Sequence, residues 1–139
     1  MAADGPITKD ERLATAFMYS DTLLDHFHNP RNVGEIANAS IVVEVSNPVC
    51  GDLMKVWAVI VEGRIQDVKF KVAGCVPSVA CGSWLTETIL SRSIEELSGL
   101  TADDVLSGLG GMPTASRHAA TLAIDGLKRL LDQVRDTRP

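Results

Sequence analysis

Three cysteines, one aspartate and one histidine are the residues whose types and positions could form a metal or sulfur site. The cysteines are Cys50, Cys75 and Cys81; Asp52 follows Cys50 after a single glycine, and His118 lies far downstream. Thiolates select zinc, copper(I) or iron–sulfur clusters, and zinc also accepts histidine and aspartate. Histidine replaces cysteine in some iron–sulfur centres. These side chains therefore point to a mixed metal or cluster site if the fold brings them together.

Cys75 lies where a predicted strand meets a predicted helix. Phe70 and Val72 alternate with lysines before it, and Pro77 after it suits the first turn of a helix, with Ser78 able to cap that turn. The dipole and the unpaired N–H groups of a helix N-terminus favour a thiolate over a thiol. We therefore expect Cys75 to be a thiolate that binds metal or accepts sulfur.

The elements that must position these side chains predict an α+β fold, with a three-stranded antiparallel sheet packed against helices and a long C-terminal helix. The loops before the second strand and after the third lie at the same end of such a sheet. Cys50, Asp52 and Cys75 are therefore expected to be neighbours, with His118 near the start of the last helix. Hydrophobic spacing predicts strands over 41–45, 53–61 and 65–72, and helices over 19–28, 78–91, 94–97, 102–106 and 114–134.

Composition limits the class of protein. The 139 residues suit one domain, which we expect to span 18–139 after a flexible extension over 1–17. The net charge of −5 argues against a nucleic-acid binder, and no apolar run reaches membrane-spanning length. Three unevenly placed cysteines are too few for a disulfide framework, and no signal peptide is visible. A reducing, cytoplasmic location is expected.

Each candidate residue also has a purely structural interpretation. A lone cysteine is most often a small buried hydrophobe, and Cys81, inside a predicted helix, fits that role as well as a ligand role. Asp52 alone could be a surface turn residue and His118 alone a helix surface residue. Cys50 and Cys75 each adjoin a glycine at a strand end, which favours the functional interpretation.

Several segments, taken in order, resemble the IscU/NifU-type iron–sulfur cluster assembly scaffolds over about residues 18–135. Each segment is weak alone, and the three site motifs are specific only together. The opening segment is Tyr19-Ser20 through His26, followed by Asn29-Pro30-Arg31-Asn32-Val33-Gly34. The three motifs are Cys50-Gly51-Asp52 with Met54-Lys55; Phe70 to Cys75 continuing to Thr86-Glu87; and Met112-Pro113 to His118 with Leu122-Ala123 and Lys128.

The resemblance implies a non-enzymatic scaffold with the same α+β fold. Such proteins assemble a [2Fe–2S] or related cluster from iron and from sulfur delivered by a cysteine desulfurase, and pass it to apo iron–sulfur proteins. Carried over by position, Cys50 and Cys75 would be cluster ligands and sulfur acceptors. Asp52 would be the carboxylate that keeps the bound species labile, and His118 would match the histidine of the third region.

The chain departs from the family at the third cysteine, which usually follows the histidine and is Ala119 here. Either Cys81 supplies the missing sulfur, or the site is one ligand short. The chain also lacks the segment Leu-Pro-Pro-Val-Lys, which a specialised Hsp70-type chaperone recognises in the family. Its absence weakens the case for such a chaperone as a partner. In its place stands Met112-Pro113-Thr114-Ala115-Ser116.

Two other functions compete with the scaffold. The first is a zinc-binding sulfur-transfer protein of SufU type, because a glycine-rich stretch before Met112 is similar to that branch, although Ala119 also removes one of its zinc ligands. The second is a cluster-less regulatory or interaction homologue that keeps the fold and a partner surface.

Overall fold

The structure is a computed structural model that describes residues 19–48 and 51–137. The extension predicted over 1–17 lies outside the described residues, and so does Cys50. Within the described part of the chain, no helix is both long and apolar enough to cross a membrane.

The sheet has three antiparallel strands in the order β1 (Ile41–Ser46), β2 (Leu53–Val61) and β3 (Arg64–Ala73). Alternating and β-branched residues form the strands, and Glu62 and Gly63 make the β2–β3 turn with φ of 53° and 75°. Two consecutive residues with positive φ are typical of the hairpin turns whose twist matches that of the strands. The predicted α+β meander is confirmed.

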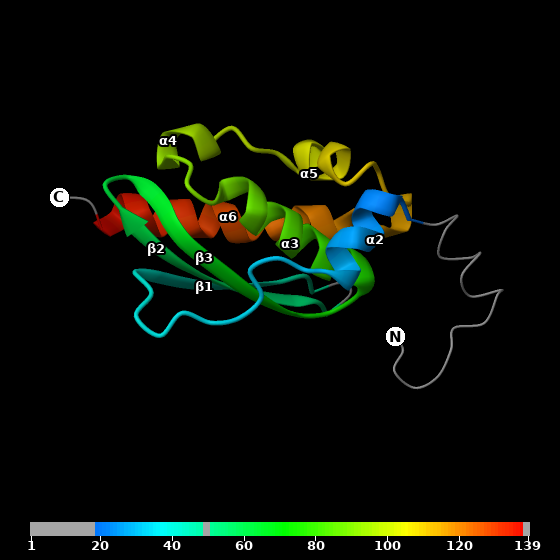
Figure 1. Ribbon diagram of the computed structural model, residues 1–139, viewed down its shortest axis with the longest axis horizontal. Coiled ribbons are helices and arrows are strands. Elements are labelled where there is room, and N and C mark those ends of the chain that lie inside the picture. Colours follow the sequence, from blue (N-terminus) through cyan, green and yellow to red (C-terminus); the bar gives the residue numbers. More distant parts are fainter. Residues whose placement is uncertain (1–18, 49–50, 138–139) are drawn as a thin grey trace.

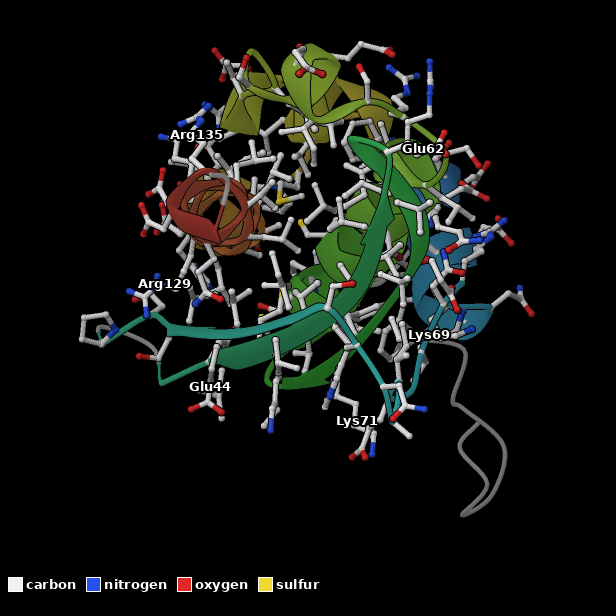
Figure 2. All side chains as sticks on the ribbon, turned by 90° about the vertical axis from the view of Figure 1, so that its left-hand side faces the viewer. Glu44, Glu62, Lys69, Lys71, Arg129 and Arg135 are labelled. Carbon is white, nitrogen blue, oxygen red and sulfur yellow. The ribbon has the colours of Figure 1, made fainter. Side chains whose placement is uncertain are left out.

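Helices cover one face of this sheet (Figure 1). Val43, Val56 and Phe70 lie in one row across the three strands and are buried beneath α3 and α6, whereas the next row, Glu44, Lys55 and Lys71, faces away. Figure 2 shows Glu44 and Lys71 on the side of the sheet opposite α6. The helices are α2 (Asp21–His28), α3 (Val76–Ile89), α4 (Ile94–Leu97), α5 (Ala102–Gly108) and α6 (His118–Thr137).

The start of the last helix differs from the prediction of 114–134. Residues Thr114–Ser116 form a 3₁₀ turn, and the α-helix begins at His118. The amide of Ser116 donates to the carbonyl of Pro113, and the amide of Arg117 to that of Thr114. Helical spacing cannot separate these i→i−3 bonds from α-helical ones, and such turns are frequent at helix ends. The consequence is that His118 occupies the first residue of α6.

A buried polar contact joins α2 to α3. His26 is 5% exposed, and its Nδ1 lies 2.7 Å from Ser83 Oγ, which also accepts a hydrogen bond from the backbone amide of Arg31. Glu87 Oε1 lies 3.6 Å from Nε2 of the same ring. Burial lowers the pKa of His26, and the Arg31 charge lowers it further, against the opposing effect of Glu87. The neutral imidazole is therefore the form that this contact stabilises.

We expect stability to fall as the pH drops below the ordinary histidine pKa of about 6.5. The unfolded chain then takes up a proton at His26 that the folded chain resists, so the folded state loses up to about 1.4 kcal/mol per pH unit until its own lower pKa is reached. Urea unfolding of the parent and of His26→Gln between neutral and mildly acidic pH measures this loss. His28→Gln, at an exposed position of the same helix, is the matched control. An unchanged pH dependence in His26→Gln contradicts the assignment.

Candidate metal and sulfur site

Asp52, Cys75 and His118 form a group whose potential ligand atoms all lie within 4.8 Å of one another. Cys75 Sγ is 3.1 Å from Asp52 Oδ2 and 3.9 Å from His118 Nε2, and the latter two atoms are 3.7 Å apart. Among the described residues, this is the only group of three or more cysteine, histidine or acidic side chains with such spacing. The structure therefore brings together a sulfur, an oxygen and a nitrogen ligand.

Three elements supply these side chains. Asp52 directly precedes β2, Cys75 is the N-cap residue of α3, and His118 is the first residue of α6. Because Leu53 pairs with Ala73, the residues just beyond that pair meet at the same end of the sheet. A Cβ at Gly74 would lie 2.7 Å from Asp52 Cγ, so the carboxylate packs directly against the Gly74 backbone. A glycine before Cys75 is what permits this approach.

Asp52 is buried, which rules out its interpretation as an exposed turn residue. It is 6% exposed, and Ser78 Oγ donates a hydrogen bond of 2.5 Å to its Oδ2. Burial raises the pKa of Asp52, but hydrogen bonds from Ser78 and Cys75 and the nearby His118 outweigh burial and hold the pKa below its usual value. The carboxylate is therefore charged at neutral pH.

The surroundings of Cys75 contradict the expectation that its side chain is a thiolate. Burial raises the pKa of the Cys75 thiol, the Asp52 carboxylate raises it further, and hydrogen bonds from Ser78 act in the opposite direction without prevailing. The sequence argument counted the helix N-terminus and left out the carboxylate, whose charge opposes a second negative charge 3.1 Å away. In this arrangement Cys75 is a thiol that donates to Asp52, and a bound cation would favour its deprotonation.

His118 presents one ring nitrogen to the group. Its Nδ1 lies 3.1 Å from the carbonyl oxygen of Ala115, in the 3₁₀ turn, and its side chain is 27% exposed. A carbonyl accepts only, so Nδ1 carries the proton and donates. Nε2 is then unprotonated in the neutral ring and available as a ligand.

Cys81 lies elsewhere. It is fully buried in the hydrophobic core within α3, outside the group of three, and burial raises the pKa of its thiol to about 12. Its prediction as the third sulfur stays a prediction, and its present environment is that of a core thiol. Cys50, the remaining candidate, lies outside the described residues.

We expect Cys81→Ser to cost about 1–3 kcal/mol of stability, because a hydroxyl replaces an apolar group in a fully buried position. Metal content and the visible spectrum of the loaded protein should stay those of the parent. Denaturant unfolding and metal analysis of the two proteins, loaded side by side, measure both quantities. A lost or shifted absorption band in Cys81→Ser would instead make Cys81 a ligand.

Ser78 is the site residue whose role the sequence argument did not identify. It was expected to cap α3, but Cys75 is the N-cap residue and has no side-chain cap bond. The Ser78 hydroxyl instead lies 2.5 Å from Asp52 Oδ2 and 3.3 Å from Cys75 Sγ, and the residue is fully buried. The sequence does not distinguish a serine that caps a helix from one that is bonded to Asp52, and only the burial of Ser78 shows that its hydroxyl needs a partner.

Comparison with known proteins gives consistent results. The family model described as "NifU-like N terminal domain" matches residues 18–137. The iron-sulfur cluster assembly scaffold protein IscU 1 of Archaeoglobus fulgidus is 46% identical, covering 82% of this chain and 74% of its own. The IscU scaffold protein of Escherichia coli is 34% identical, covering 86% and 96%. In fold, an N-terminal NifU-like protein from Brucella abortus superposes with a TM-score of 0.72 at 20% identity, covering 87% and 96%.

Proposed function

Because the chain belongs to the NifU-like N-terminal domain family, to which its IscU relatives point as well, we propose that it is a scaffold on which iron–sulfur clusters are assembled. The observation that carries the proposal is the convergence of Asp52, Cys75 and His118 at one end of the sheet. We include residues 18–139 in a single scaffold domain.

In this proposal, Cys50 and Cys75 are the sulfur acceptors and cluster ligands. Asp52 and His118 complete the ligand set, and Cys81, which is buried in the core within α3, is expected to stay outside it. The cluster, of [2Fe–2S] or related type, is cargo rather than a resident cofactor. A cysteine desulfurase delivers the sulfur and apo iron–sulfur proteins receive the product, so the chain acts as a carrier and not as an enzyme.

The chemistry of the described ligands suits a carrier. Carboxylate oxygen is a hard ligand beside a soft sulfur, so it holds iron more weakly than a thiolate would. Asp52 is already charged, and Cys75 loses its proton as it binds a cation. His118 offers Nε2 as a nitrogen ligand, because its Nδ1 is engaged with the carbonyl oxygen of Ala115. A site of this composition can load and release its cargo by exchanging the oxygen ligand.

A zinc-binding sulfur-transfer protein is the second candidate, and the same three ligands support it. Zinc accepts sulfur, nitrogen and oxygen in a tetrahedral arrangement, and three protein ligands leave a fourth position for a thiol or water. Zinc in the isolated protein would be compatible with both functions, so metal content alone does not decide between them.

Anaerobic reconstitution with ferrous iron, cysteine, a cysteine desulfurase and a dithiol reductant, which supplies the two electrons that convert each persulfide sulfur to sulfide, tests the proposal. We expect a sulfide-to-iron charge-transfer band with matched amounts of iron and acid-labile sulfide, and transfer of the cluster to an apo-ferredoxin. Tight zinc that resists replacement, together with sulfur transfer, would establish the second function instead. If neither iron, sulfide nor zinc is retained, both functions are excluded and the chain is a cluster-less interaction homologue.

A further inference from the structure

Ser78 contacts two of the candidate ligands at once. It is the third residue of α3 and is fully buried, with Oγ 2.5 Å from Asp52 Oδ2 and 3.3 Å from Cys75 Sγ. A serine hydroxyl has one hydrogen to donate. Because Asp52 is a buried, charged acceptor and lies closer than the sulfur, that hydrogen is donated to the carboxylate.

The Asp52 oxygen that accepts the Ser78 hydrogen bond is also the one nearest the other two candidate ligands. Asp52 Oδ2 lies 3.1 Å from Cys75 Sγ and 3.7 Å from His118 Nε2. A metal ion held jointly by these three residues would meet Asp52 at Oδ2. The Ser78 hydrogen bond therefore draws charge from the oxygen that the metal would use, and the two compete for its electron density.

The carboxylate has little freedom to avoid this competition. On one side it packs against Gly74, where a Cβ would lie within 3.0 Å of both of its oxygens. Ser78 lies in the first turn of a helix whose packing fixes the position of its Cα. The Asp52 side chain is thus held between the backbone of Gly74 and the hydroxyl of Ser78.

We propose that Ser78 is a positioning residue that weakens the metal–oxygen bond of Asp52 and so makes this ligand exchangeable. In the empty site the hydroxyl holds Asp52 in place. When a metal takes Oδ2, the hydroxyl can rotate toward Cys75 Sγ, its other neighbour at 3.3 Å. The inference rests on the proposed function only in treating Asp52 as a ligand.

The test uses Co²⁺ as the probe, because it takes the same sulfur and nitrogen ligands as zinc and its visible absorption reports thiolate coordination. Ser78→Ala frees Oδ2, so we expect it to bind Co²⁺ about tenfold more tightly and to release it to a chelator correspondingly more slowly. In an Asp52→Asn background, where the oxygen ligand is poor, the same Ser78→Ala change should leave Co²⁺ affinity unaltered.

Ser83→Ala is the matched control, since Ser83 is an equally buried serine of α3 whose partners are His26 and the Arg31 backbone. It should leave Co²⁺ affinity at the parent value. Ser78→Thr keeps the hydroxyl and should also match the parent, and it provides the comparison if Ser78→Ala does not fold.

An equal effect of Ser78→Ala in the parent and in the Asp52→Asn background, or no effect in either, overturns the inference. Tightened binding in Ser78→Thr overturns it as well. These outcomes are independent of cluster assembly: failure of reconstitution would remove the proposed function and leave the Co²⁺ coupling between Ser78 and Asp52 measurable.

Discussion

Replacing Cys75 with alanine is expected to abolish cluster retention and to lower metal affinity by at least about a hundredfold. Cys75 contributes the only sulfur of the ligand group among the described residues, and Asp52 and His118 alone are two ligands of unlike type. Soft thiolate coordination is what selects iron–sulfur clusters and zinc over harder cations. Anaerobic reconstitution followed by iron, sulfide and zinc analysis measures the loss.

The stability of the metal-free protein should fall by only about 1 kcal/mol in Cys75→Ala. The change removes the hydrogen bond that the thiol donates to the buried Asp52 carboxylate, while the Ser78 hydrogen bond to Asp52 remains. Cys81→Ser provides the matched thiol control, with stability altered and metal content kept. Parent-like iron and sulfide in Cys75→Ala would remove Cys75 from the ligand set and with it the basis of the proposed site.

Local patterns in the sequence were sufficient to predict the sheet. Each strand alternates or is β-branched, so the topology of the sheet and the approximate bounds of its strands could be predicted, and the structure places a tight turn at Glu62 and Gly63 between the second and third strands. The meander then required that the residues before β2 and after β3 meet at one end. The short distance between Asp52 and Cys75 is a consequence of that topology.

The protonation of the site could not be predicted in the same way. A helix N-terminus favours a thiolate when it is the only influence, but here a charged carboxylate and burial act on the same sulfur. Those effects depend on distances of a few ångströms, which spacing in the sequence does not determine. The contact of Ser78 with Asp52 could not be predicted for the same reason, because a serine that caps a helix and a serine bonded to Asp52 look identical in the sequence.

The sequence also did not predict that a short segment pairs with the free edge of β3. The segment around Asn32–Gly34 pairs with β3, since the amide of Phe70 donates to the carbonyl of Asn32 and the amide of Gly34 to that of Phe70. Pro30 and Gly34 flag this segment as a turn, and Asn32 has a positive φ of 63°. Pairing between segments distant in sequence leaves no periodic signal when only one or two residues take part.

The packing of α3 on β3 leads to the second large expected effect, in Gly82→Ala. Gly82 is buried in α3, and a Cβ there would lie 2.4 Å from Cε2 and 2.6 Å from Cδ2 of Phe70. Phe70 is 1% exposed at the β3 end of the inner row of the sheet, so its ring has little free space to enter. We expect the free energy of unfolding to fall by about 1–3 kcal/mol, as in other overpacked cores.

The expected loss of stability is opposite in sign to the effect of helix propensity, so the two can be told apart. Alanine is favoured over glycine inside a helix by about 1 kcal/mol, so propensity alone predicts a more stable protein. Gly99→Ala is the control: nothing lies within 4 Å of a Cβ there, and its stability should stay within about 0.5 kcal/mol of the parent. Denaturant unfolding of the three proteins measures the difference. A Gly82→Ala protein as stable as the parent would mean that α3 and β3 are packed less closely than this, and because Cys75 begins α3, the site geometry would then be in question too.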